Sequence, residues 1–170
     1  LNISVFVLIR PRGGNFVYSD AEFEIMKRDI KLCKDLGSHG IVSGVLNADK
    51  TIDINRTKEL VELSKPLQFT FHRAFDEVAN AKEALEQLID LGAERVLTSG
   101  QETSAEKGLE ILQVLNKISN NRIIILAGSG INSENALKFK EIGLKEIHAS
   151  ASSQLEEHNS LFRMPLPYSD

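Results

Sequence analysis

Strand-like and helix-like segments alternate strictly along this chain, and this alternation constrains its fold more than any other feature. Short apolar or β-branched runs are each followed by a longer segment whose apolar residues recur at helical spacing. Three helical segments end on the same pattern, at Leu36-Gly37, Leu91-Gly92 and Ile142-Gly143. Glycine is favoured just past the last turn of a helix. The alternation therefore predicts parallel strands joined by crossover helices.

Six strand–helix units can be delimited in this way. Strands are expected over 5–9, 41–46, 68–72, 95–98, 122–127 and 146–149. The first helix is expected to begin at Ser19 or Asp20 and to stop at Gly37. Later helices are expected over 55–63, 80–91, 104–118 and 132–142, and residues 152–170 are expected to form an irregular tail.

Two architectures satisfy this alternation, an open doubly wound sheet and a closed barrel. No Gly-x-Gly-x-x-Gly follows the first strand, so the main mark of a dinucleotide-binding sheet is missing. Polar residues end nearly every strand, which favours a barrel mouth. A (β/α)8 TIM barrel has eight strand–helix units in about 250 residues. We therefore predict one TIM-barrel domain over 1–170 with six of the eight units, lacking the two N-terminal ones.

Composition and charge exclude several classes of function. With 42% hydrophobic and 26% charged residues, the chain has the composition of a globular domain. A net charge of −4 argues against a nucleic-acid partner. No apolar run approaches the roughly 20 residues of a membrane span, so no membrane partner is expected. The single cysteine, Cys33, permits no intrachain disulfide, which suits the cytoplasm.

In a barrel, the residues at the carboxyl ends of the strands converge on one mouth, where active sites lie. Alternation along the third strand predicts that Thr70 and His72 point into the barrel, whereas Phe69 and Phe71 pack against helices. By the same rule His148 points inward on the sixth strand and Ile147 outward. The candidate mouth residues are Arg10, Arg12, His72, Arg73, Asp76, Ser99, Gly128, Ser129, Gly130 and His148.

His72, His148 and Asp76 form the candidate catalytic set. An imidazole has an ordinary pKa of about 6.5, close to neutral pH, so two inward histidines can serve as acid and base. The alternative is that each histidine is a hydrogen-bonded interior residue. Both interpretations place the side chains inside the barrel.

The arginines predict a small anionic ligand. The guanidinium groups of Arg10, Arg12 and Arg73 match carboxylate or phosphate in a bidentate manner. The alternative is that Arg10 and Arg12 pair with neighbouring acids. Ser99 and the run Gly128-Ser129-Gly130 join the predicted binding site, because backbone N–H groups before a helix expected at 132 would bind phosphate. A tight strand-to-helix turn is the alternative for that run.

A copper site can be tested against the residues directly. Cu(I) favours thiolate and thioether ligands, and the chain offers Cys33, Met26 and Met164. Met26 and Cys33 are seven residues apart on the apolar face of one expected helix, so we interpret them as core residues. The residues themselves predict no soft copper site.

Four motifs resemble the hallmark segments of the CutC family, which is named for copper homeostasis. They are Ile9-Arg10-Pro11-Arg12-Gly13-Gly14-Asn15-Phe16-Val17-Tyr18-Ser19, Thr70-Phe71-His72-Arg73-Ala74-Phe75-Asp76, Leu97-Thr98-Ser99-Gly100 and Ile147-His148-Ala149-Ser150. The resemblance implies a (β/α)8 barrel, a cytoplasmic protein, a homodimer in several members and a role in copper homeostasis with copper as a possible ligand. It also implies that Arg10, Arg12, His72, Arg73, Asp76, Ser99 and His148 line the mouth.

The chain departs from the family pattern in two places. Family members begin with two strands that bear cysteine-containing segments, and neither segment occurs in this sequence. Gly128-Ser129-Gly130 stands where a run of three glycines is usual. Two hypotheses follow: a copper-binding protein, on resemblance alone, or an enzyme or former enzyme acting on a small phosphorylated or carboxylated molecule.

Overall fold

A computed structural model describes residues 3–151 of the chain. Its six strands form one sheet in the order β1-β2-β3-β4-β5-β6, and each neighbouring pair is parallel. The strands are β1 (Phe6–Leu8), β2 (Gly40–Ser43), β3 (Gln68–Phe71), β4 (Arg95–Thr98), β5 (Ile124–Gly128) and β6 (Glu146–His148). The predicted parallel alternation is thus confirmed. The expected tail over 152–170 lies outside the described residues.

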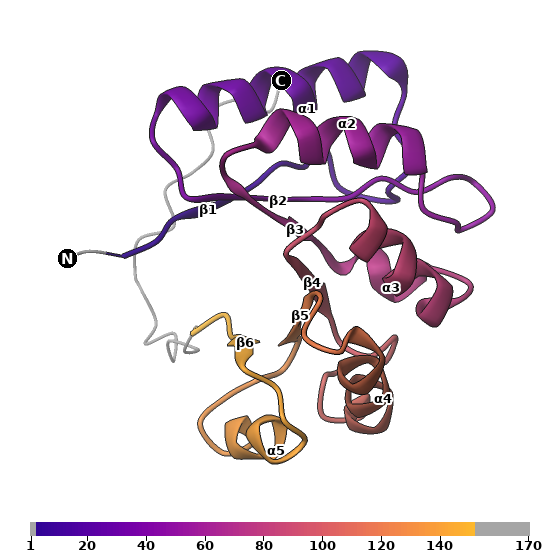
Figure 1. Cartoon of the computed structure of the whole chain (residues 1–170), viewed down its shortest axis with the longest axis vertical. Helices are drawn as coiled ribbons and strands as arrows, with labels where there is room; N and C mark the ends of the chain where they lie inside the picture. Colours follow the sequence, from indigo (N-terminus) through magenta and orange to yellow (C-terminus); the bar gives the residue numbers. More distant parts are fainter. Residues whose placement is uncertain (1–2, 152–170) are drawn as a thin grey trace, which may run out of the picture.

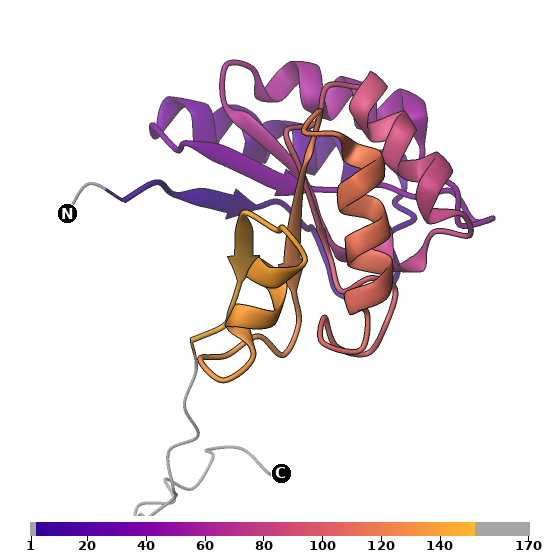
Figure 2. The ribbon, with the colours of Figure 1, turned by 60° about the horizontal axis from the view of Figure 1, so that its bottom comes forward.

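The helices cover the outer face of a curled sheet, which gives the molecule the form of a half-barrel. They are α1 (Asp20–Asp35), α2 (Ile54–Ser64), α3 (Ala81–Asp90), α4 (Leu109–Ser119) and α5 (Ala136–Glu141), with a 3-10 helix η1 (Arg73–Glu77) after β3. The strands follow an arc from β1 to β6 with the helices outside it (Figure 1). Turning the molecule shows α1 and α2 on the side of β1 and β2 that faces away from β6 (Figure 2).

Local sequence signals set where α1 begins and which face it buries. The Ser19 side chain accepts from the backbone N–H of Glu22, and the Glu22 carboxylate accepts from the backbone N–H of Ser19, a capping box. The buried residues of α1 are the predicted stripe of Phe23, Met26, Ile30 and Cys33. No helix within residues 3–151 combines the length and apolar character that crossing a membrane requires.

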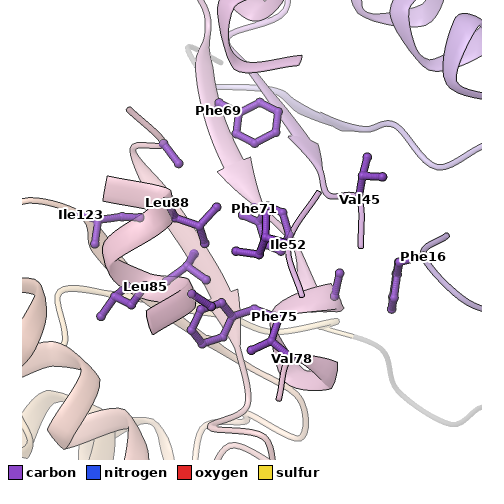
Figure 3. Close-up of a cluster of buried hydrophobic side chains, with 14 of the residues drawn as sticks. Phe16, Val45, Ile52, Phe69, Phe71, Phe75, Val78, Leu85, Leu88 and Ile123 are labelled. Atoms are coloured by element: carbon purple, nitrogen blue, oxygen red, sulfur yellow. The ribbon is translucent and has the colours of Figure 1, made fainter. Parts of the chain in front are cut away.

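The hydrophobic core lies between the sheet and the helices. Phe69 and Phe71 of β3 are buried on this side, and Phe71 lies near Leu88 and Phe75, with Phe69 further from them along the strand (Figure 3). Their orientation confirms the alternation predicted for this strand, with the aromatic side chains outward and the polar ones toward the concave face. A large packed core on one face leaves the other face of each strand free to line a site.

The structure corrects three expectations about the elements. The helix expected from 132 begins at Ala136, because the Asn132 side chain accepts from the backbone N–H of Glu134 and Asn135 and forms a turn instead. The helix expected from 104 begins at Leu109. Ile147 was expected to pack against helices but is 43% exposed on β6, which is an edge strand of the described sheet.

Candidate functional site

A cavity of about 690 Å³ occupies the concave side of the sheet. Alternation explains its lining, because every second residue of a strand faces inward. Strand β3 contributes Gln68, Thr70 and His72, and the lining residues of β1 and β4 also alternate, whereas β6 contributes Ile147 as well as Glu146 and His148. The remaining lining residues include Phe6, Leu8, Arg10, Phe16, Val42, Arg73, Arg95, Leu97, Leu126, Glu146 and His148. Of the predicted mouth residues, Arg10, His72, Arg73 and His148 therefore share one cavity.

His72 is a buried and neutral histidine at the carboxyl end of β3. Its Nδ1 accepts a hydrogen bond of 3.2 Å from the backbone N–H of Ala74, so the ring proton is on Nε2. Burial lowers the pKa of His72 to about 4, and the nearby positive charge of Arg10 acts in the same direction. Within the described part of the chain, Nε2 is buried and has no hydrogen-bond partner. His72 is thus a fixed Nε2–H donor at neutral pH.

The imidazole ring of His72 is held between a glycine and a phenylalanine. A Cβ at Gly44 would lie 2.8 Å from Nδ1, so only glycine leaves room for the ring. On the other side, the ring centroid of Phe16 lies 4.8 Å from that of His72. The guanidinium carbon of Arg10 lies 4.6 Å from the centroid of Phe16. Arg10, Phe16 and His72 therefore form a continuous stack at the rim of the cavity.

Asp76 is not a lining residue of the cavity. Its carboxylate holds neighbouring segments of the chain together through hydrogen bonds. Its carboxylate accepts from the Thr98 hydroxyl at 2.5 Å and the Ser99 backbone N–H at 3.0 Å. It also accepts from the Ser99 hydroxyl, the Gln101 backbone N–H and, at 2.7 Å, Nε of Arg73. These bonds tie η1 to the loop after β4. Arg73, which also donates to the Ser99 hydroxyl at 3.1 Å, is thereby fixed at the cavity.

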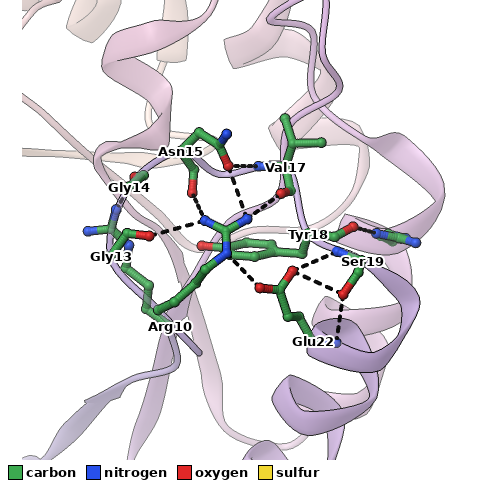
Figure 4. Close-up of polar contacts among 10 residues, drawn as sticks. Arg10, Gly13, Gly14, Asn15, Val17, Tyr18, Ser19 and Glu22 are labelled. Atoms are coloured by element: carbon green, nitrogen blue, oxygen red, sulfur yellow. Dashed lines mark hydrogen bonds and ion pairs between the residues drawn. The ribbon is translucent and has the colours of Figure 1, made fainter.

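Arg12 does not line the cavity. Its guanidinium pairs with Glu22 at 2.6 Å and donates to backbone carbonyls of Gly13, Asn15 and Val17. It also lies 5.1 Å from the centroid of the Tyr18 ring. Figure 4 shows the oxygen atoms that accept hydrogen bonds from this guanidinium. The alternative that an arginine pairs with a neighbouring acid therefore holds for Arg12, which shapes the loop after β1.

The glycine run after β5 is a tight turn and does not lead into a helix. Ser129 and Gly130 both have positive φ, and the Ser129 hydroxyl donates to the carbonyl of Thr103 at 3.2 Å. A Cβ at Gly128 would lie 2.6 Å from Cδ1 of Leu97. Because α5 begins only at Ala136, the expected phosphate cradle at a helix start is wrong in its geometry.

Two features of the cavity were not singled out from the sequence. The hydroxyl of Thr70 is buried and, like Nε2 of His72, has no partner among the described residues. The side chain of Arg95 pairs with Glu146 at 2.7 Å and donates to Gln68 at 2.7 Å, so it joins β4 to β6 and β3. The alternation of side chains along β3 predicts that Thr70 points inward. The partners of Arg95 lie 27 and 51 residues away in the sequence, so the residues next to Arg95 do not indicate them.

The described residues do not fit a copper site. No group of three or more His, Cys, Asp or Glu residues within 3–151 has an arrangement that could hold a metal ion. Cys33 and Met26 lie in the core on α1, and burial raises the pKa of the Cys33 thiol, which disfavours the thiolate that binds Cu(I).

A curled parallel sheet with outer helices and a cavity on its concave side defines this chain as part of a (β/α)-barrel protein. The model of the CutC family matches residues 1–153, and the chain belongs to that family. It is 48% identical to a CutC family protein of Bacteroides fragilis over 151 residues, 88% of this chain and 60% of the relative. The corresponding protein of Photorhabdus laumondii is 47% identical over 152 residues, 89% of this chain and 61% of the relative. The chain thus spans about 60% of the length of these curated relatives.

Solved structures support the same fold. The putative copper homeostasis protein CutC of Streptococcus agalactiae superposes with a TM-score of 0.82 at 37% identity, over 86% of this chain and 72% of that one. A protein described as QR15, an aldolase, superposes with a TM-score of 0.69 at 19% identity, over 86% of this chain and 68% of that one. The second likeness concerns the fold alone.

Proposed function

We propose that this chain binds a small phosphorylated or carboxylated molecule at its barrel mouth, as an enzyme or a former enzyme. The observation that supports the proposal is the state of Arg10. It is exposed at the cavity, and no carboxylate within residues 3–151 forms an ion pair with it. A guanidinium without an acidic partner matches the charge and the planar acceptor geometry of phosphate or carboxylate, and Arg73, which pairs with Asp76, brings a second guanidinium to the same cavity.

The two histidines supply a hydrogen-bond donor and a group that can carry a proton, both of which a reaction of such a ligand would use. Neutral His72 is a hydrogen-bond donor that would polarise an oxygen atom of the ligand, without a change in its own charge. His148 is exposed on the cavity side of β6 and is our candidate for moving a proton between ligand and solvent. Copper binding is not part of the proposal, because the described residues offer no suitable ligand set.

Titration with inorganic phosphate and with acetate, followed by NMR chemical shifts, tests the anion site. We expect Arg10→Gln to weaken binding about tenfold or more, because a hydrogen bond to a charged group contributes roughly 1.5–3 kcal/mol. Arg122→Gln is the matched control, since it removes an equal charge at a surface ion pair with Glu86. Equal binding by the two variants, or no binding by the wild type, would overturn the proposal.

A further inference from the structure

Two buried polar atoms on the inward face of β3 have no partner. Thr70 is 1% exposed and His72 is 4% exposed, and both line the cavity. Within the described residues, neither the hydroxyl of Thr70 nor Nε2 of His72 has a hydrogen-bond partner. Leaving a buried polar group unpaired costs roughly 1–3 kcal/mol. Two such groups on one strand and in one cavity point to a ligand that satisfies both.

The chemistry of the two groups indicates what kind of atom they would bind. The Ala74 N–H fixes the tautomer of His72, so Nε2 only donates. A neutral imidazole and a hydroxyl carry no charge that could compensate a buried anion. The imidazole and the hydroxyl are therefore suited to binding an uncharged oxygen atom of the ligand. The exposed guanidinium of Arg10 is suited to binding the anionic group of the ligand.

The geometry indicates how such a ligand would lie. Inward-facing residues two apart on a strand have Cα atoms about 6.6 Å apart, so His72 and Thr70 would meet successive oxygen atoms rather than the same one. His72 is nearer the mouth, next to the stack of Phe16 and Arg10, and Thr70 is deeper. Because Nε2 of His72 is buried, the ligand would reach it by displacing a side chain that covers it. Arg95, which is the register partner of Thr70 on β4, pairs with Glu146, and both also line the cavity.

We propose that the ligand is a small anion that also carries carbonyl or hydroxyl oxygens, with its phosphate or carboxylate at Arg10 and its uncharged oxygens at His72 and Thr70. This inference rests on the proposed anion site and specifies the ligand class of that same site. It assigns binding roles to Thr70 and to Nε2 of His72, beyond the arginines.

Matched pairs of ligands test the inference. Propyl phosphate and dihydroxyacetone phosphate have the same charge and number of carbons, but only the second carries the extra oxygens. Butyrate and 2-oxobutyrate form the corresponding carboxylate pair. In the wild type we expect the oxygenated member of at least one pair to bind about 5- to 25-fold more tightly, since each of its one or two new hydrogen bonds contributes about fivefold.

Variants assign that preference to the two residues. Thr70→Val should reduce the preference for the oxygenated member about fivefold, and His72→Phe should reduce it by a similar factor. Thr57→Val is the matched control, because Thr57 is a second buried threonine with an unpartnered hydroxyl but lies on α2 outside the cavity lining. Both valine variants remove a buried unpaired hydroxyl, so neither should lose stability. Thr70→Val therefore remains informative even if His72→Phe does not fold.

The outcomes separate this inference from the proposed function. If the wild type binds both members of each pair equally, the inference is wrong and the anion site stands. If it binds no member of either pair, both proposals fail. A preference that survives Thr70→Val and His72→Phe, or that Thr57→Val abolishes equally, would also overturn the assignment to β3.

Discussion

At the scale of single residues, the buried state of His72 makes the stability of the fold depend on pH. The pKa of His72 is about 4 in the folded chain and about 6.5 in an unfolded chain. The unfolded state therefore binds a proton between pH 6.5 and pH 4 that the folded state does not. This contribution to stability is fully present above pH 6.5 and is lost as the pH falls through this window, by up to about 3 kcal/mol.

Urea unfolding at pH 7.5 and pH 5 measures this dependence. We expect His72→Gln to show a smaller loss of unfolding free energy between these two pH values than the wild type. His148→Gln, which changes an exposed histidine, should retain the wild-type dependence. A dependence that is the same in all three proteins would contradict a neutral, buried His72.

Arg10 and Arg12 are two residues apart but should affect different properties. Arg12→Gln removes an ion pair and several hydrogen bonds inside the loop after β1, so we expect the free energy of unfolding to fall by about 1–2 kcal/mol. Arg10→Gln should cost less stability, because Arg10 donates to the carbonyl of Gly14 and packs on Phe16 but forms no ion pair within residues 3–151, and it should weaken phosphate binding. Urea unfolding of both variants checks this, and a larger loss of stability in Arg10→Gln would refute the division of roles.

The sequence alone placed Arg10 and His72 at the mouth but could not separate Arg10 from Arg12. Strand phase and position at a strand end are local properties, so they predict which residues face inward. Whether a guanidinium is already saturated depends on the conformation of its loop. That conformation includes the carbonyl of Val17 and the carboxylate of Glu22, which the sequence does not arrange in space.

At the scale of elements, Asp76 joins η1 to the loop after β4. Asp76→Asn keeps the size of the side chain but turns one acceptor oxygen into a donor, which then faces donors such as the Ser99 N–H. We expect a loss of about 2–3 kcal/mol in unfolding free energy and weaker phosphate binding, because Arg73 loses its anchor. Asp49→Asn is the control, since that carboxylate contacts only its own loop at Thr51. Equal urea midpoints for the two variants would contradict this role.

Element order and type could be predicted, whereas the ends of elements near the site could not. The start of α1 follows from the cap at Ser19, which is a local signal. The helix η1 and the late start of α5 depend on side-chain bonds that compete with helical ones. Asp76 bonds to residues 22 to 25 positions further along, so its role could not be deduced from spacing.

At the scale of the whole molecule, the described sheet has two edge strands, β1 and β6. An exposed edge offers unpaired backbone N–H and C=O groups to another chain. Apolar side chains stand at both edges: Val5, next to β1, is 53% exposed and Ile147 of β6 is 43% exposed. The two strands lie at the two ends of the arc (Figure 1). This surface favours association through edge strands.

We therefore expect the 170-residue chain, expressed alone, to self-associate as its concentration rises. The double variant Val5→Lys with Ile147→Lys should remain monomeric to higher concentration, because lysine on an edge opposes strand pairing. Ile25→Lys on the exposed face of α1 is the matched control, since it changes a comparably exposed residue away from the edges. Sedimentation velocity over a range of concentrations distinguishes these cases. If the wild type sediments as one monomeric species throughout, or if Ile25→Lys has the same effect as the edge variant, association does not proceed through the sheet edges.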